Sequence, residues 1–300
     1  HPATIARGFS QAEEFALSAL SELKIEADLD QIKSAVETSL AGKMDQASQI
    51  HLSGLALEAA NNILKDGRAD PTRVKVIQQG GSRIGNTELT SGLAIAKTKI
   101  HPEMHENGGP GTILLIDGGI ERKKPLAEAK ISVESVGMLD AFRAAESKAL
   151  AKQIDNLISI GCDLVVCREG IDDEAKQALA NAGILAYRRV ESKDLDLLAN
   201  SCGATTVHDA TRASKADLGV FIQTREELRG GVNHWILDAE DGGATLIARA
   251  STKEVLGEVE RCFADALGVA CQLVEQPWLL PGAGATQVAL ARRLRRHAES

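Results

Sequence analysis

Two histidines stand at the spacing that a helix uses to bind a metal ion. His101 and His105 are four positions apart, so on a helix both imidazoles would lie on one face. Pro102 follows the first histidine, and three glycines within 108–111 follow the second, which is typical of a loop. The sequence therefore does not predict a metal site here.

A glycine-rich string is a second candidate, because glycines let a backbone approach a phosphate group. Gly80, Gly81 and Gly85 stand close together, but the lysine followed by serine or threonine of a phosphate loop is missing from this string. The pattern favours a hinge over a phosphate site.

The overall charge and the low aromatic content argue against a nucleic acid partner. The chain has 42 acidic and 34 basic residues, a net charge of −8, and only 3% aromatic residues, which leaves little for phosphate binding or base stacking. One basic cluster, Arg292, Arg293, Arg295 and Arg296, stands near the C-terminus. We interpret it as the solvated face of a terminal helix.

The cysteines favour a reducing compartment, so we expect a cytoplasmic protein. Their number, five, is odd, and their spacing matches neither a zinc site nor a disulfide framework. No basic segment followed by an apolar stretch opens the chain, and no apolar run reaches the roughly 18 residues of a membrane helix. The sequence begins at His1 without a methionine, which indicates a piece of a longer protein.

Helices are expected at the beginning of the chain. Apolar residues recur at steps of three and four from Ile5 to Leu23. Asp28 is a predicted N-cap of a second helix that ends near Leu40, and a third helix follows over 52–63.

The middle of the chain alternates strands with helices. We expect strands at 74–77, 93–98, 112–117, 163–167, 184–190, 218–223, 232–238 and 244–250, and helices over about 139–157, from 172, over 252–276 and after Pro281. Strands that alternate with helices indicate an α/β core. Helical ends around this core predict a discontinuous outer domain with a second domain inserted into it, and termini that lie close together. The predicted fold class is α/β, or α+β overall.

Seven short strings stand in this order along the chain: Gly80-Gly81-Ser82, Asn86-Thr87-Glu88-Leu89, His101-Pro102-Glu103-Met104, Gly170-Ile171-Asp172-Asp173, Arg188-Arg189-Val190, Asp265-Ala266-Leu267 and Pro281-Gly282-Ala283-Gly284-Ala285. In type and order these strings resemble the group II chaperonins, the thermosome family. The resemblance is spread over essentially all 300 residues. The family has an equatorial ATP-binding domain, a hinge-like intermediate domain and an apical domain.

The resemblance implies a division of the chain into parts of these domains. Residues 1–25 and 278–300 are similar to helices at the equatorial border, 26–88 and 241–277 to the two halves of the intermediate domain, and 89–240 to the apical domain with a helical lid protrusion at about 130–159. The family's equatorial phosphate loop, a Gly-Asp-Gly-Thr-Thr-type string, is not found in this sequence. We therefore expect this chain alone to hydrolyse little ATP.

The resemblance also implies roles for individual residues. Asp265 stands at the position of the family's catalytic aspartate, which orients or activates the water that attacks the γ-phosphate of ATP. A solvated helix carboxylate is the alternative. Lys43, after Gly42, is similar to a nucleotide-sensing lysine, although a helix-terminal lysine that complements the helix dipole is an equal alternative.

Glycines that let the backbone approach bound nucleotide in the family correspond to Gly282 and Gly284. Ala283 between them departs from the family's triple glycine, which puts that close approach in question.

The segment 131–142 is similar to the lid protrusion of the family. The resemblance makes Val136, Met138, Leu139 and Phe142 the candidate residues for lid closure or contact with client proteins. Packing of the same residues in the apical core is the alternative.

The resemblance implies part of an ATP-dependent chaperone that binds unfolded proteins and encloses them. ATP and Mg²⁺ would be the cofactors of the full-length parent protein. We expect neither to bind to this chain alone, and we expect no metal site in it. The expected partners are non-native polypeptides and other subunits of a double ring, without nucleic acid or membrane. The alternative is a free-standing α/β binding protein or small-molecule enzyme derived from the same fold.

Overall fold

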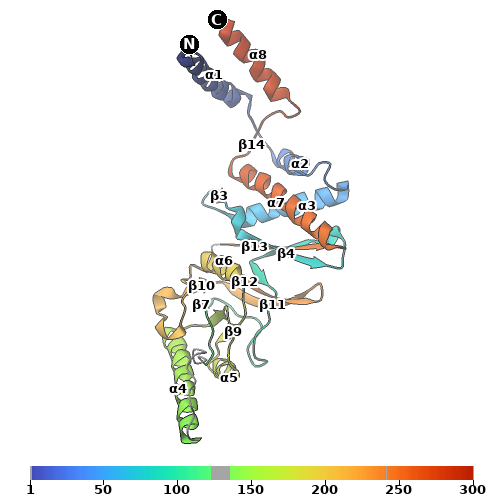
Figure 1. The fold of residues 1–300 in the computed structure, drawn as a ribbon. Coiled ribbons are helices and arrows are strands. Elements are labelled where there is room, and N and C mark those ends of the chain that lie inside the picture. The colour runs from blue at the N-terminus through green and yellow to red at the C-terminus, as the bar shows by residue number, and fades with distance from the viewer. Residues whose placement is uncertain (1, 123–135, 241, 300) are drawn as a thin grey trace. The chain divides into compact units, whose positions relative to one another are not determined.

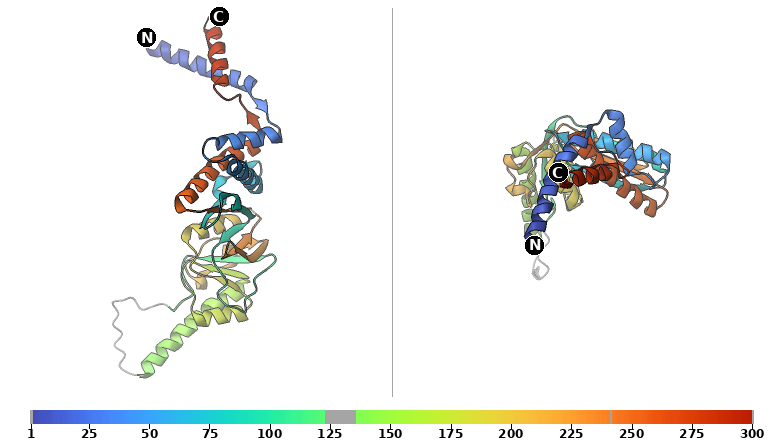
Figure 2. Two further views of the ribbon diagram at one scale, coloured as in Figure 1. Left: turned by 90° about the vertical axis from the view of Figure 1, so that its right-hand side faces the viewer. Right: turned by 90° about the horizontal axis from the view of Figure 1, so that it is seen from above.

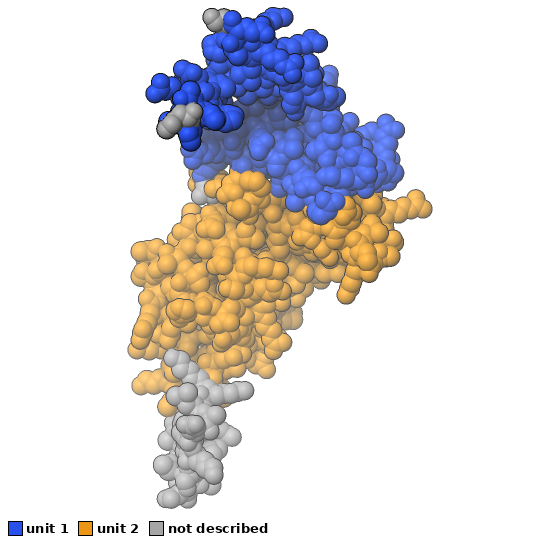
Figure 3. Space-filling view, turned by 45° about the horizontal axis from the view of Figure 1, so that its top comes forward, with its two compact units in different colours: residues 1–69, 261–300 blue, residues 70–260 orange. Residues whose placement is uncertain are grey.

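The computed structural model describes residues 2–122, 136–240 and 242–299, with side chains described from residue 144 onward in the helix that begins at 136. The chain divides into two compact units: unit 1 comprises 1–69 and 261–300, and unit 2 comprises 70–260 (Figure 3). Both ends of the chain therefore build one unit, and the middle of the chain forms the other. The domain boundaries expected from the resemblance are a finer division and remain a prediction.

Unit 1 is mainly helical. Its helices are α1 (Pro2–Leu23), α2 (Leu29–Ser39), α3 (Gln46–Ile63), the second half of α7 (Lys253–Glu275) and α8 (Ala285–Glu299). Two short antiparallel pairs complete it, β1 (Ile25–Glu26) with β14 (Trp278–Leu279) and β2 (Leu64–Lys65) with β3 (Arg68–Ala69). Helices α1 and α8 place the two termini at the same end of this unit, as the sequence predicted (Figures 1 and 2).

Local sequence determines where α2 begins. Asp28 accepts a hydrogen bond from the backbone N–H of Gln31 at 2.8 Å, and the Gln31 side chain accepts one from the backbone N–H of Asp28 at 3.0 Å. This reciprocal capping box satisfies two backbone donors that the first turn of a helix leaves without partners. The predicted N-cap is confirmed.

In its described residues, unit 2 contains three sheets, three complete α-helices and the beginning of α7. The sheets have the strand orders β10-β7-β8-β9, β11-β12-β6 and β4-β13-β5. The strands are β4 (Val74–Gly80), β5 (Glu88–Ser91), β6 (Leu93–Ile95), β7 (Gly111–Ile116), β8 (Leu164–Cys167), β9 (Leu185–Tyr187), β10 (Gly219–Phe221), β11 (Gln223–Arg229), β12 (Val232–Asp238) and β13 (Ala244–Ala250); the helices are α4 (Val136–Ile160), α5 (Asp173–Asn181) and α6 (Ser192–Cys202). Four short 3₁₀ turns lie at Pro71–Arg73, Ile84–Asn86, Ala210–Arg212 and Lys215–Asp217.

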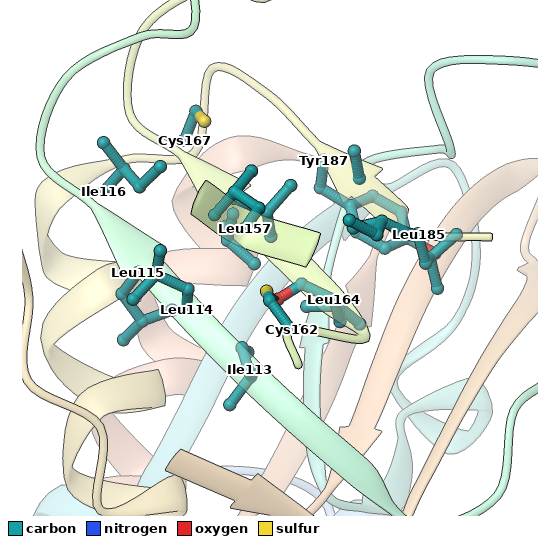
Figure 4. Packing of buried hydrophobic residues seen from close by; sticks show 14 of the residues in the cluster. Ile113, Leu114, Leu115, Ile116, Leu157, Cys162, Leu164, Cys167, Leu185 and Tyr187 are labelled. Atoms are coloured by element: carbon teal, nitrogen blue, oxygen red, sulfur yellow. Dashed lines mark hydrogen bonds between the residues drawn. The ribbon is translucent and has the colours of Figure 1, made fainter. Parts of the chain in front are cut away.

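The main core of unit 2 surrounds its parallel strands. All four residues from Ile113 to Ile116 are fully buried, and so are those of β8, as expected when helices cover both faces of a parallel sheet. Leu157 of α4 packs among these strand residues (Figure 4). The mixed helix and sheet fold predicted from the sequence is confirmed.

Strand β11 was not predicted from the sequence. Its residues, Gln223–Arg229, are almost all polar, so the alternating apolar pattern of a strand is missing. It forms because it pairs antiparallel with β12 through the Gly230–Gly231 turn, where both glycines have positive φ. Arg225 then pairs with Asp238 of β12.

Strands far apart in the sequence also pair. Strand β4 runs parallel to β13, with Val74 opposite Ala244 and Gly80 opposite Ala250. Strand β5 pairs with the other edge of β13 in the antiparallel direction. This register could not be derived from spacing, because the two parallel strands are separated by most of unit 2.

Candidate functional site

Lys43 follows a tight turn at the end of α2. Leu40, the C-cap, is fully buried and anchors the turn, and its carbonyl accepts a hydrogen bond from the Lys43 N–H at 3.1 Å. Gly42 has φ +75°, a left-handed conformation that glycine adopts without a steric cost. The turn therefore fixes the backbone that carries the Lys43 side chain.

Asp265 lies on the exposed face of α7. Its neighbours Phe263 and Ala266 are fully buried, as the helical period requires of the opposite face. The carboxylate thus faces away from the core of unit 1.

The structure brings Lys43 and Asp265 together, although they are 222 residues apart in the sequence. The Lys43 ammonium donates to the Asp265 carboxylate at 2.6 Å, and both side chains are partly exposed. Arg261, one turn earlier on α7, approaches the same carboxylate oxygen at 3.4 Å. Sequence reasoning missed Arg261, although its i,i+4 spacing from Asp265 was a usable signal.

Gly282 and Gly284 lie in a different loop of unit 1, between β14 and α8. Ala283 (φ +53°) and Gly284 (φ +81°) are both left-handed, and the Thr286 hydroxyl closes the turn by donating to the carbonyl of Pro281 at 2.6 Å. Open space surrounds the positions that a Cβ would occupy at Gly282 and Gly284. The alanine therefore does not prevent the turn, and the loop leads directly into the N-terminus of α8.

An ammonium group, such as that of Lys43, and an open glycine backbone at a helix N-terminus, such as that before α8, each favour negative charge. The structure brings Lys43 and Asp265 into contact, whereas the loop that carries Gly282 and Gly284 is a separate feature of unit 1. No group of three His, Cys, Asp or Glu side chains that could hold a metal ion occurs in the described part of the chain.

The predicted lid residues lie at the start of α4. Val136, Met138, Leu139 and Phe142 belong to this helix, but their side chains lie outside the described residues, as does the segment 123–135. Their role in lid closure or client contact remains a prediction.

Comparison with known proteins identifies the family. The TCP-1/cpn60 chaperonin family matches residues 1–300, so the chain belongs to this family. The chain is 30% identical over 303 residues to thermosome subunit beta of Methanothermobacter thermautotrophicus, and the match covers 100% of this chain and 56% of that protein. It is 33% identical over 310 residues to thermosome subunit 2 of Haloferax volcanii, covering 100% of this chain and 55% of that protein.

A solved structure supports the same assignment. The open state monomer of a group II chaperonin from Methanococcoides burtonii matches with a TM-score of 0.78 and 25% identity, covering 100% of this chain and 71% of that one. The resemblance to group II chaperonins is therefore confirmed, and a free-standing binding protein or enzyme is not favoured. The chain spans about half the length of the curated relatives that it matches. None of its described helices is long and apolar enough to cross a membrane.

Proposed function

We propose that this chain is part of an ATP-dependent chaperonin subunit that binds non-native polypeptides and encloses them for folding. The observation that carries the proposal is the contact between Lys43 and Asp265. It connects the N-terminal and C-terminal parts of unit 1. These are the two residues for which the family resemblance implies nucleotide sensing and catalysis. We further propose that the subunit assembles with other subunits in a ring and works in the cytoplasm.

Lys43 and Asp265 would have different roles at the nucleotide: Lys43 would sense the terminal phosphate, and Asp265 would orient the attacking water. ATP with Mg²⁺, when bound, supplies the phosphoanhydride whose hydrolysis drives domain movement. Lys43 would pair with the terminal phosphate and so report its presence, because loss of that phosphate removes the partner charge. Release of Lys43 would remove one cation from the Asp265 carboxylate, beside which Arg261 also lies, and the carboxylate would then hold and orient the attacking water.

Unit 2 would present the client-binding surface. Its lid segment, about 130–159, includes Val136, Met138, Leu139 and Phe142, whose apolar side chains suit contact with unfolded chains. Support comes from the family match over the whole chain and from the long helix α4 at this place.

The client-binding half can be tested with this chain alone. A chemically unfolded test protein is diluted into nucleotide-free buffer with and without the chain, and aggregation is followed by light scattering. We expect the chain to suppress scattering, and Phe142→Ser to weaken suppression. Val220→Ser is the matched control, because Val220 is an apolar residue of unit 2 with 58% exposure outside the lid segment. Equal scattering with and without the chain would contradict client binding by this chain.

A test of the proposed ATP hydrolysis needs the part of the subunit that this chain lacks. A chimera can supply it, with residues 1–300 replacing the matching segment of the Methanothermobacter thermautotrophicus protein. We expect ATP turnover by the chimera, and a loss of about 10²-fold or more in Asp265→Ala, the usual contribution of a positioned base. Glu254→Gln, an exposed carboxylate on the same helix, serves as the control. An unchanged rate in Asp265→Ala would refute the proposed role.

A further inference from the structure

A basic cavity of about 550 Å³ lies within unit 2, where β9 ends. Three segments line it: residues 96–100 after β6, Arg188 and Arg189 after β9, and residues 231–233 at the β11–β12 turn. Among the described residues, its charged lining residues are Lys97, Lys99, Arg188 and Arg189, and none of these lining residues is acidic. A cavity lined by four cations contrasts with the net charge of −8 of the whole chain. The four cations give the cavity a positive potential.

One of the four cations has an internal role. The Lys99 ammonium lies 3.1 Å from the Glu106 carboxylate and donates to the carbonyl of Met104 at 2.6 Å, which holds the loop after β6. The charge of Lys99 is thus largely compensated within the protein.

The other three cations have no ion pair with a residue of the described ranges 2–122, 144–240 and 242–299. The hydrogen bond with Lys176 is the main reason why the pKa of Asp173 is lowered, and Arg188 contributes least. The hydrogen bond with Lys193 is likewise the main reason why the pKa of Glu191 is lowered, and Lys97 contributes least. Each carboxylate has a closer partner outside the cavity lining: Asp173 lies 2.5 Å from the Lys176 ammonium, and Glu191 lies 3.1 Å from that of Lys193. The positive charges of Arg188 and Arg189 therefore remain available to a ligand. Lys97 contributes less, because it also lines an adjoining cavity whose lining includes Glu191, Asp194 and Glu260.

The backbone at Arg189 explains why two adjacent arginines line one cavity. Successive residues of an extended strand point to opposite faces. Arg189 has φ +56°, a left-handed conformation that is unfavourable for a residue with a Cβ and breaks this alternation. Two backbone hydrogen bonds hold the turn, from the Arg189 N–H to Glu169 at 3.0 Å and from the Val190 N–H to Cys167 at 3.1 Å. Strain of this kind persists only where the surrounding structure fixes it.

The chemistry of the cavity selects the class of ligand. A guanidinium group can bind two phosphate oxygens in a bidentate geometry, and a lysine ammonium adds a point charge. Thr98 and Asn233 supply neutral hydrogen-bond donors. The lining residues that the structure describes include no aromatic side chain, so they offer no platform for a nucleobase. The volume lies within the range of small-molecule sites.

We propose that this cavity binds a small multivalent phosphate anion through Arg188, Arg189 and Lys97. The site is separate from Lys43 and Asp265, which belong to unit 1, and it does not depend on the function proposed above.

Isothermal titration calorimetry of the 300-residue chain with sodium tripolyphosphate tests the proposal. We expect binding that weakens as ionic strength rises from about 0.02 to 0.15 M. Arg188→Gln and Arg189→Asn should each weaken binding about tenfold, the scale of one charge-assisted hydrogen bond, and Lys97→Gln should weaken it less. Asparagine is chosen at 189 because it tolerates positive φ. Lys152→Gln, an exposed lysine of α4, should leave affinity unchanged.

Two further measurements make the outcome decisive. Circular dichroism and thermal melting of each variant show whether the chain remains folded, and only folded variants are compared. Hexaglutamate is the second probe, because an acidic peptide could also use these cations. Tighter binding of hexaglutamate than of tripolyphosphate overturns the proposal, as does absence of tripolyphosphate binding or an equal loss of affinity in Lys152→Gln.

Discussion

Replacing Asp194 by asparagine should strongly destabilise unit 2. Asp194 lies in the first turn of α6, and its carboxylate is 2.7 Å from the ammonium of Lys75 on β4. The two side chains are only 8% and 12% exposed. Asp194→Asn retains the size of the side chain but leaves the Lys75 charge buried without a partner.

The magnitude follows from the geometry of the pair. Coulomb's law at 2.7 Å, with an effective dielectric constant of about 20, gives an attraction of roughly 6 kcal/mol as a ceiling. Removing one partner of a buried pair costs about 3–5 kcal/mol, because the other charge is left buried and uncompensated. With a urea m-value of about 2 kcal/mol/M, the unfolding midpoint should fall by about 2 M.

The loss should depend on pH in a defined direction. Burial lowers the pKa of Lys75 in the folded protein, whereas its hydrogen bond and charge interaction with Asp194 raise it. Without the carboxylate, the folded pKa of Lys75 falls further below its unfolded value. Between these two pKa values the unfolded chain binds more protons, so the free energy of unfolding rises with pH. The destabilisation by Asp194→Asn should therefore be smaller at pH 9.5 than at pH 7.

Urea unfolding followed by tryptophan fluorescence measures this effect. Trp235 is fully buried in unit 2, and Trp278→Phe removes the half-exposed tryptophan of unit 1, so the signal reports on unit 2 alone. Lys193→Gln is the control, because its exposed pair with Glu191 should leave the midpoint unchanged. A midpoint shift below about 0.5 M, or an equal loss at both pH values, would refute the reasoning.

Three further predictions concern unit 2. Gly92→Ala should lower the urea midpoint, because Gly92 has φ +81° and a Cβ there would clash with the Asp238 carboxylate and with the backbone carbonyl of Leu237. Tyr187→Phe should cost about 1.5–3 kcal/mol in the same assay, since the buried hydroxyl donates to Glu226 at 3.0 Å. Cys162 should resist iodoacetamide at pH 8 until denaturant is added, because burial raises the pKa of its thiol to about 12; rapid labelling of the folded chain would contradict this.

Residues with a strong local pattern were predictable from the sequence. The runs at 232–238 and 244–250 are the strands β12 and β13 with the predicted boundaries, because each contains a short apolar run, at 235–237 and 246–248. Asp28 was predictable as an N-cap because its bonding partners lie within the next three residues. These features depend on interactions between residues that are close together in the sequence.

Features that depend on distant partners were not predictable. Strand β11 is polar and becomes a strand only through its pairing with β12. Nothing in the spacing of Lys75 and Asp194 indicated that they would meet, and the pair emerges only when β4 and α6 are in place. The family resemblance selected Lys43 and Asp265 separately, whereas their contact is a result of the three-dimensional structure.

The two long-range ion pairs differ in what they can do. The Lys75–Asp194 pair is buried, so its separation leaves a charge without water and it serves to hold β4 and α6 together. The Lys43–Asp265 pair has side chains that are 29% and 42% exposed, and such pairs contribute about 0–1 kcal/mol. Water can replace either partner at little cost, so Lys43 can exchange the carboxylate for a phosphate without disrupting the fold. An ion pair of this kind suits a contact that must open and close with the nucleotide, which is the role proposed for it.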